Sequence, residues 1–220
     1  MTAALLFLLA SVMACLVQRV AFLRYGTHLN RRRVTGSEAA RFILDECDYP
    51  ATSIERGRAA RDPAEKKMTL SAPLYEGVSL WEIAAVAREA ALWARFPGSL
   101  GSPESFFSNP FWEVPATAMA WAALVLSMVP GVPAAAGKLL SVFFGLLWIR
   151  AAVRFMTERK AGAEALRLLK KSGYFEMDEI VRLKKIFKSW QGESFAVLVQ
   201  VPAALGRRLA RKFVPQGGPA

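Results

Sequence analysis

The chain has 220 residues, 54% of them hydrophobic, and its 29 Lys and Arg residues against 18 Asp and Glu give a net charge of +11. This length allows one modest domain, and so high an apolar fraction predicts long apolar runs beside it. A single histidine excludes any site that needs two or three imidazoles. Two cysteines, Cys15 and Cys47, provide neither a disulfide framework nor the spacing of metal ligands, and we expect both to be free thiols.

An apolar run of about 20 residues opens the chain. It extends from Ala3 to Leu23, with Gln18 and Arg19 as polar interruptions near its end. A helix of that length crosses a hydrocarbon core of about 30 Å, so the run predicts a transmembrane anchor over residues 1–23. A cleaved signal peptide is the alternative, but here the basic residues follow the apolar run instead of preceding it.

Two further apolar runs lie close together in the second half of the chain. They extend over residues 114–129 and 139–155, and Pro130-Gly131-Val132-Pro133 separates them. Proline and glycine end one helix and turn the chain before the next, which predicts a transmembrane helical hairpin over residues 113–156. A buried hairpin in a soluble core is the alternative. It is disfavoured because a single lysine in the turn is the only charge before the last part of the second run.

The C-terminal part of the chain is strongly basic. Residues 150–220 hold 15 of the 29 Lys and Arg but only 6 of the 18 Asp and Glu. We expect residues 157–220 to form a tail of basic amphipathic helices. Its apolar segment 194–205 is expected to lie on the membrane surface. The alternative is that this segment spans the membrane, but the positive-inside rule disfavours it. Four basic residues are expected to contact anionic lipid headgroups: Arg207, Arg208, Arg211 and Lys212. Nucleic acid is not an expected partner, because no aromatic residues interleave with these basic residues.

A polar domain of mixed helices and strands is expected between the anchor and the hairpin, over residues 24–112. Two capping-box sequences, 35–38 and 79–82, predict the starts of a short helix and of a long helix that ends near Phe96. Short strands are expected at 49–54 and 68–71. The positive-inside rule places this domain in the cytoplasm, so the chain as a whole is predicted to be a mostly α, multi-pass membrane protein with a small α+β domain.

The long helix carries the most informative motif, Arg88-Glu89-Ala90-Ala91-Leu92. A zinc peptidase needs His-Glu-x-x-His, in which two imidazoles one helical turn apart hold the metal and the glutamate polarises its water. Arginine and leucine supply neither ligand. Taken alone, the five residues are typical of an ordinary amphipathic helix.

Several motifs together resemble the bacterial membrane zinc metallopeptidases of the YugP-like type. The matching segments are Thr35-Gly36-Ser37-Glu38-Ala39-Ala40-Arg41-Phe42-Ile43-Leu44, then Asp62-Pro63 through Lys67 to Leu70-Ser71, then Tyr75-Glu76-Gly77-Val78-Ser79, then Ile83 to Glu89 and the stretch Glu158 to Gly173. The resemblance covers nearly the whole chain and implies a third ligand position at Glu158. It also exposes the departures, since Arg88 and Leu92 replace the two histidines and only the two glutamates, Glu89 and Glu158, survive.

The resemblance therefore implies a pseudopeptidase in a bacterial plasma (inner) membrane, with no catalytic residue, no metal and no cofactor. Such a protein would act as an interaction or complex-stabilising subunit that binds the lipid bilayer and another membrane protein. The alternative is an active metallopeptidase or hydrolase with a non-standard site. Two carboxylates, Glu89 and Glu158, are a poor match for tetrahedral zinc. We expect Arg88 to bridge to Glu158 or a neighbouring acid, while Leu92 fills the other ligand's space with apolar packing; the alternative is that Arg88 points to solvent.

Overall fold

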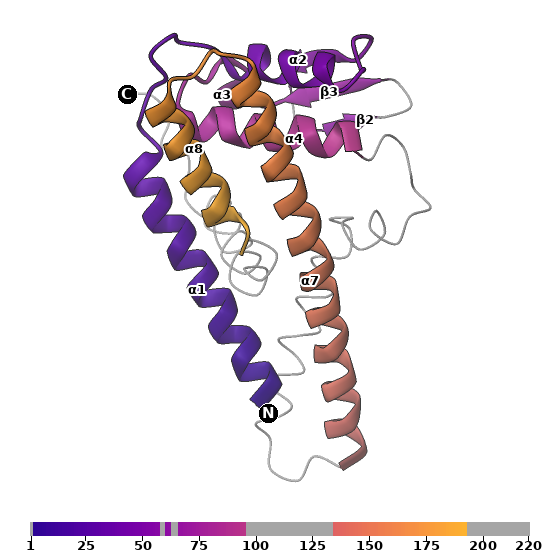
Figure 1. The fold of residues 1–220 in the computed structure, drawn as a ribbon. Coiled ribbons are helices and arrows are strands. Elements are labelled where there is room, and N and C mark those ends of the chain that lie inside the picture. The colour runs from indigo at the N-terminus through magenta and orange to yellow at the C-terminus, as the bar shows by residue number, and fades with distance from the viewer. Residues whose placement is uncertain (1, 58–59, 63–65, 96–133, 193–220) are drawn as a thin grey trace, which may run out of the picture.

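The computed structural model describes residues 2–57, 60–62, 66–95 and 134–192. Two long helices, α1 (Thr2–Tyr25) and α7 (Ala134–Lys171), rise to a layer that contains α2 (Gly36–Glu46), α3 (Ala72–Glu76), α4 (Leu80–Arg95) and a small sheet (Figure 1). The last described helix, α8 (Met177–Trp190), contacts both long helices and α4. The N-terminus lies at the end of the long helices remote from that layer (Figure 1).

The sheet has three short strands, β1 (Ser53–Arg56), β2 (Ala60–Asp62) and β3 (Lys67–Leu70), in the order β1-β3-β2. β1 runs parallel to β3, and β2 runs antiparallel to it. The central strand contributes two nearly fully buried side chains, those of Met68 and Leu70, to the core. The strand expected at 49–54 overlaps β1 only at its end, whereas the strand expected at 68–71 differs from β3 by one residue.

Both predicted capping boxes are confirmed. At the start of α2, the backbone N–H of Glu38 donates to Thr35 Oγ1 over 3.3 Å, and the backbone N–H of Thr35 donates to Glu38 Oε2 over 2.7 Å. At the start of α4, Ser79 and Glu82 exchange the same pair of bonds over 3.1 and 3.2 Å. Each pair satisfies backbone donors that the first turn of a helix leaves open, which fixes where the helix begins.

Helix α4 lies at the centre of the fold. It contacts α1, α2, α3, α7 and α8. Its buried side chains are largely small, so that neighbouring helices approach closely: Leu80, Ile83, Ala84, Val86, Ala87, Ala90, Ala91 and Trp93 are all at most 4% exposed. The helix that carries the motif of interest is therefore held from several sides.

None of the helices, over the residues that the structure describes, is long and apolar enough to cross a membrane. The predicted transmembrane anchor at 1–23, the transmembrane hairpin at 113–156 and the multi-pass plasma-membrane location are therefore wrong. The mostly helical composition with a small sheet remains. The first apolar run of the expected hairpin, the segment 194–205 and the basic cluster at 207–212 lie outside the described residues.

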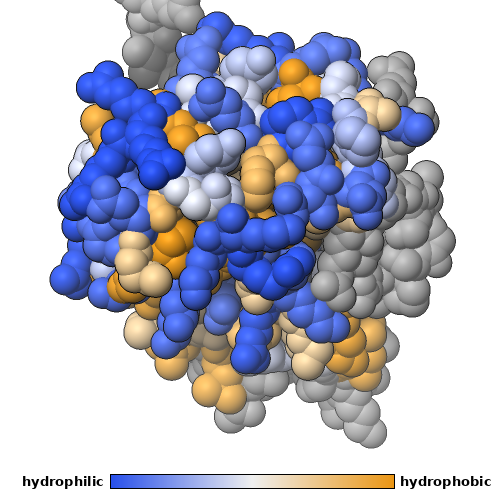
Figure 2. All heavy atoms as spheres, turned by 45° about the horizontal axis from the view of Figure 1, so that its top comes forward, coloured by the Kyte–Doolittle hydropathy of each residue, from blue (hydrophilic) through white to orange (hydrophobic). Residues whose placement is uncertain are grey.

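Polar side chains within the two long helices give a physical reason for this correction. Ser11 of α1 is fully buried, and Arg150 of α7 is only 9% exposed, so both apolar stretches carry polar groups on faces that pack against protein. α7 also continues to Lys171 without a break at the predicted domain boundary after residue 156. Leu9 and Leu23 of α1 nevertheless remain exposed, whereas hydrophilic side chains predominate on the face that Figure 2 turns forward.

Candidate functional site

The four motif positions lie on two packed helices. Arg88, Glu89 and Leu92 are half-buried on α4, and Glu158 is 9% exposed on α7. α4 and α7 are in contact, so the structure brings together the elements that the sequence analysis assigned to one site. Leu92 packs against the hydrophobic core.

Arg88 lies over an aromatic ring. Its guanidinium carbon is 4.8 Å from the ring centroid of Trp190, the last residue of α8. Trp190 is 6% exposed, and its ring meets the ring of Trp81 edge-on at 4.7 Å and that of Phe187 at 6.0 Å. A cation over the face of a buried tryptophan is a favourable arrangement, so the arginine links α4 to α8.

Glu158 is paired within its own helix. Its Oε1 lies 3.4 Å from Nη2 of Arg154, one turn earlier, and Arg150 lies one further turn back on the same face of α7. The guanidinium groups of Arg150 and Arg154 thus share a helix face with the Glu158 carboxylate. An opposite charge at this distance favours the ionised carboxylate and offsets the cost of burying it.

These residues do not fit a zinc ion. Arg88 has no lone pair to donate, and Leu92 has no donor atom. The motif therefore keeps two carboxylates, one of which Arg154 already neutralises in part. Elsewhere in the described parts of the chain, no group of three or more His, Cys, Asp or Glu side chains is placed to hold a metal ion.

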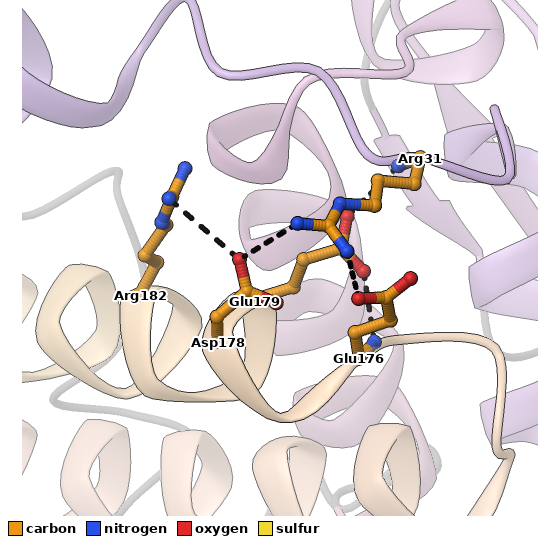
Figure 3. Close-up of polar contacts among 5 residues, drawn as sticks. All are labelled: Arg31, Glu176, Asp178, Glu179 and Arg182. Carbon is orange, nitrogen blue, oxygen red and sulfur yellow. Dashed lines mark hydrogen bonds and ion pairs between the residues drawn. The ribbon is translucent and has the colours of Figure 1, made fainter.

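A second polar cluster joins α8 to the segment after α1, and the sequence analysis missed it. Glu179 is 3% exposed and accepts hydrogen bonds from the backbone N–H groups of Arg31, over 2.8 Å, and Glu176, over 2.9 Å. The Arg31 guanidinium pairs with Glu176, and Asp178 lies 3.6 Å from both Arg31 and Arg182 (Figure 3). The three-residue spacing of Glu176 and Glu179 is a sequence signal for a capped helix start. It does not reveal that Glu179 also accepts a hydrogen bond from Arg31.

A cavity of about 510 Å³ lies over the outer face of α2. Its walls include three aromatic side chains, Phe42, Tyr75 and Tyr174, and the carboxylates of Glu38 and Asp45. The four motif positions on α4 and α7 are not among its lining residues. The sequence analysis identified no residue of this cavity as functional, because the lining comes from four separate segments.

Both cysteines are free and half-buried. Burial raises the pKa of the Cys47 thiol above its ordinary value, and the nearby Glu164 carboxylate raises it further. Burial also raises the pKa of Cys15. Neither thiol has the depressed pKa that a nucleophilic cysteine needs.

Comparison with known protein families confirms the resemblance found in the sequence. The family described as "Putative neutral zinc metallopeptidase" matches residues 1–191, which include α4, Glu158 and α8. No curated protein and no solved structure gives a match. Since the family covers far more than half of the 220 residues, the chain belongs to the putative neutral zinc metallopeptidase family.

Proposed function

We propose that this chain is a catalytically inactive member of its family and that it works by binding another protein. The observation that carries the proposal is the position of Arg88. Where the family motif would place its first histidine, a guanidinium lies 4.8 Å from the ring centroid of Trp190. An arginine in that position supports α4 against α8 and offers no ligand to a metal.

Electrostatics also oppose a metal at this position. A guanidinium about 4 Å from a dication would be repelled by several kcal/mol even at an effective dielectric constant of 20. Arg154 already pairs with Glu158, and Arg150 lies on the same helix face, so the local positive charge is high. The remaining motif position, Leu92, is part of the packed core and gives the ion no oxygen, nitrogen or sulfur.

A binding role fits a fold whose helices are joined by direct contacts between side chains and backbone. The Arg88–Trp190 contact joins α4 to α8, and the Arg31–Glu179 hydrogen bond joins α8 to the segment before α2. These contacts fix α4, α8 and the segment before α2 relative to one another. The surfaces of α1, α2 and the sheet then remain to be recognised by a partner.

Metal content and peptide cleavage test the proposal. The protein, purified without chelators, is expected to contain far less than one zinc per chain and to leave casein and a mixed peptide library intact. A variant with Arg88→His and Leu92→His provides two imidazoles one turn apart on α4, the helix that contacts the helix of Glu158, and it is expected to gain zinc. About one zinc per wild-type chain, together with cleavage that Glu89→Gln abolishes, would establish the alternative of an active enzyme with a non-standard site.

A further inference from the structure

The cavity over α2 lies beside an unpaired strand edge. β1 is at one side of the sheet, and no strand pairs with its outer edge among the described residues. The backbone N–H groups of Ser53 and Gly57 donate to Lys66 and Leu70, over 2.9 and 2.8 Å. Because alternate residues of a strand face its partner, the N–H and C=O groups of Ile54 face the other way. Ser53 and Ile54 both line the cavity, so the outer edge of β1, which no described strand occupies, borders it.

Arg41 holds this edge in place. Its guanidinium donates to the carbonyl oxygens of Thr52, over 2.6 Å, and Tyr49, over 2.9 Å, and pairs with Asp45 at 2.7 Å. The segment that leads into β1 is therefore tied to α2 before any ligand arrives. A preorganised edge loses less conformational entropy when another segment pairs with it.

The cavity walls combine aromatic surface with negative charge. Phe42 and Tyr174 meet edge-to-face at 5.9 Å, and Tyr75 lines the same cavity from α3. Asp45 pairs with Arg41 and keeps a side chain that is 50% exposed. Glu38 uses Oε2 in the cap of α2, and its side chain is exposed. In a chain of net charge +11, two carboxylates beside one arginine make this cavity locally acidic.

We propose that the cavity binds an extended peptide segment of a partner protein, which pairs with β1 and places a Lys or Arg side chain against Asp45 and Glu38. Addition of a strand to a free sheet edge supplies affinity through the backbone, and pockets for alternate side chains supply specificity. The aromatic walls suit the aliphatic stem of a basic side chain, while the carboxylates suit its charged end. This inference rests on the proposed binding function and names the kind of partner it serves.

Fluorescence anisotropy of labelled peptides on the full chain tests the site. The probe is a capped six-residue peptide of valine and threonine with one central lysine, and its counterpart carries glutamate instead. We expect saturable binding of the lysine peptide and a preference over the glutamate peptide of about fivefold or more. A version N-methylated at every residue is expected to lose binding, because neither of its edges can then donate backbone hydrogen bonds to β1.

Charge reversal provides the matched control. Asp45→Lys is expected to abolish or invert the preference for lysine, whereas Glu164→Lys, a side chain of similar exposure outside the cavity, is expected to preserve it. For each variant, the measured quantity is the ratio of its affinities for the lysine and glutamate peptides. This ratio does not depend on what fraction of the variant is folded. Equal affinities in the wild type, no saturable binding up to millimolar peptide, or full binding of the N-methylated peptide would each overturn the proposed site.

Mass spectrometry of the bound lysine peptide separates this inference from the proposed function. A bound and intact peptide supports both. A bound peptide that is cleaved keeps the binding site and refutes the inactive assignment, while an absence of binding refutes the site and leaves the inactive assignment standing.

Discussion

Glu179 of α8 accepts a hydrogen bond over 2.8 Å from the backbone N–H of Arg31, a residue 148 positions earlier in the chain. The carboxylate is 3% exposed, and its second oxygen accepts from the backbone N–H of Glu176 over 2.9 Å. One side chain thus caps a helix and fastens a distant loop to it. A buried carboxylate is tolerated here because each oxygen receives a donor.

Replacement of this side chain by its amide isostere is expected to destabilise the fold. In Glu179→Gln, one of the two backbone N–H groups would face an amide NH₂ instead of an oxygen. A buried donor left without an acceptor costs about 1–3 kcal/mol, so we expect the free energy of unfolding in urea to fall by that amount. Glu176→Gln is the control, because its side chain is 50% exposed and surface ion pairs contribute at most about 1 kcal/mol. Equal losses in the two variants would contradict this account of Glu179.

Coupling between Arg88 and Trp190 can be measured by a double-mutant cycle. Arg88→Met and Trp190→Leu remove the cation and the ring, separately and together. The two losses in unfolding free energy are expected to be non-additive by about 1–2 kcal/mol, since the ring is nearly fully buried. Arg24 over Tyr25, at 5.7 Å and with an exposed arginine, offers a comparison pair that is expected to couple more weakly. Additive losses at Arg88 and Trp190 would mean that the contact contributes no energy.

The sequence predicted the elements whose signals are local. The capping boxes at Thr35 and Ser79 fixed the starts of α2 and α4, because each box places two interacting side chains three residues apart. The same locality allowed the motif on α4 to be found and identified as degenerate. Whether Arg88 also pairs with Glu158, as the sequence analysis expects, stays a prediction.

Most of the features that sequence analysis missed depend on distant residues, and the length of α7 is the exception. Hydropathy predicted a break after residue 156, but α7 continues to Lys171, because Glu, Arg, Lys and Ala are good helix formers. The bond between Arg31 and Glu179 and the cavity over α2 arise only when several segments pack together. Average hydropathy also gave no sign that Arg150 is buried against protein. The membrane-spanning prediction rested on average hydropathy, and it was wrong.

The reactivity of Cys47 follows from its raised pKa. Because burial and then Glu164 raise the pKa of this thiol, we expect slow alkylation by iodoacetamide near neutral pH, with a rate that is still rising at a pH where the rate in urea has already levelled off. In a Cys15→Ser background, the rate in folded protein should be far below that in urea. The neutral thiol also contributes stability that is complete below the unfolded pKa and is lost as pH rises through the higher folded pKa. Equal alkylation rates in folded and unfolded protein would contradict the burial of Cys47.

Gly36 lies where the chain leaves no room for a side chain. A Cβ atom at this position would lie 1.9 Å from the backbone carbonyl oxygen of Leu74 and 3.1 Å from a methyl group of Val86. The backbone N–H of Gly36 also donates to the carbonyl oxygen of Gly77 over 2.9 Å, so the start of α2 and the segment around α3 are held close together. Overpacking of this kind costs about 1–3 kcal/mol, and a backbone atom cannot move aside as the end of a side chain can.

Gly36→Ala is therefore expected to lower the free energy of unfolding in urea by about 1–3 kcal/mol or more. Gly145→Ala is the matched control, because that glycine lies within α7 and a Cβ there would meet nothing within 4 Å. Alanine forms helix more readily than glycine, so the control is expected to be neutral or to stabilise by up to about 1 kcal/mol. The opposite signs of the two effects come from the same chemical change, and only the space around each Cβ distinguishes them. A neutral Gly36→Ala would show that α3 does not approach α2 as closely as the structure places it.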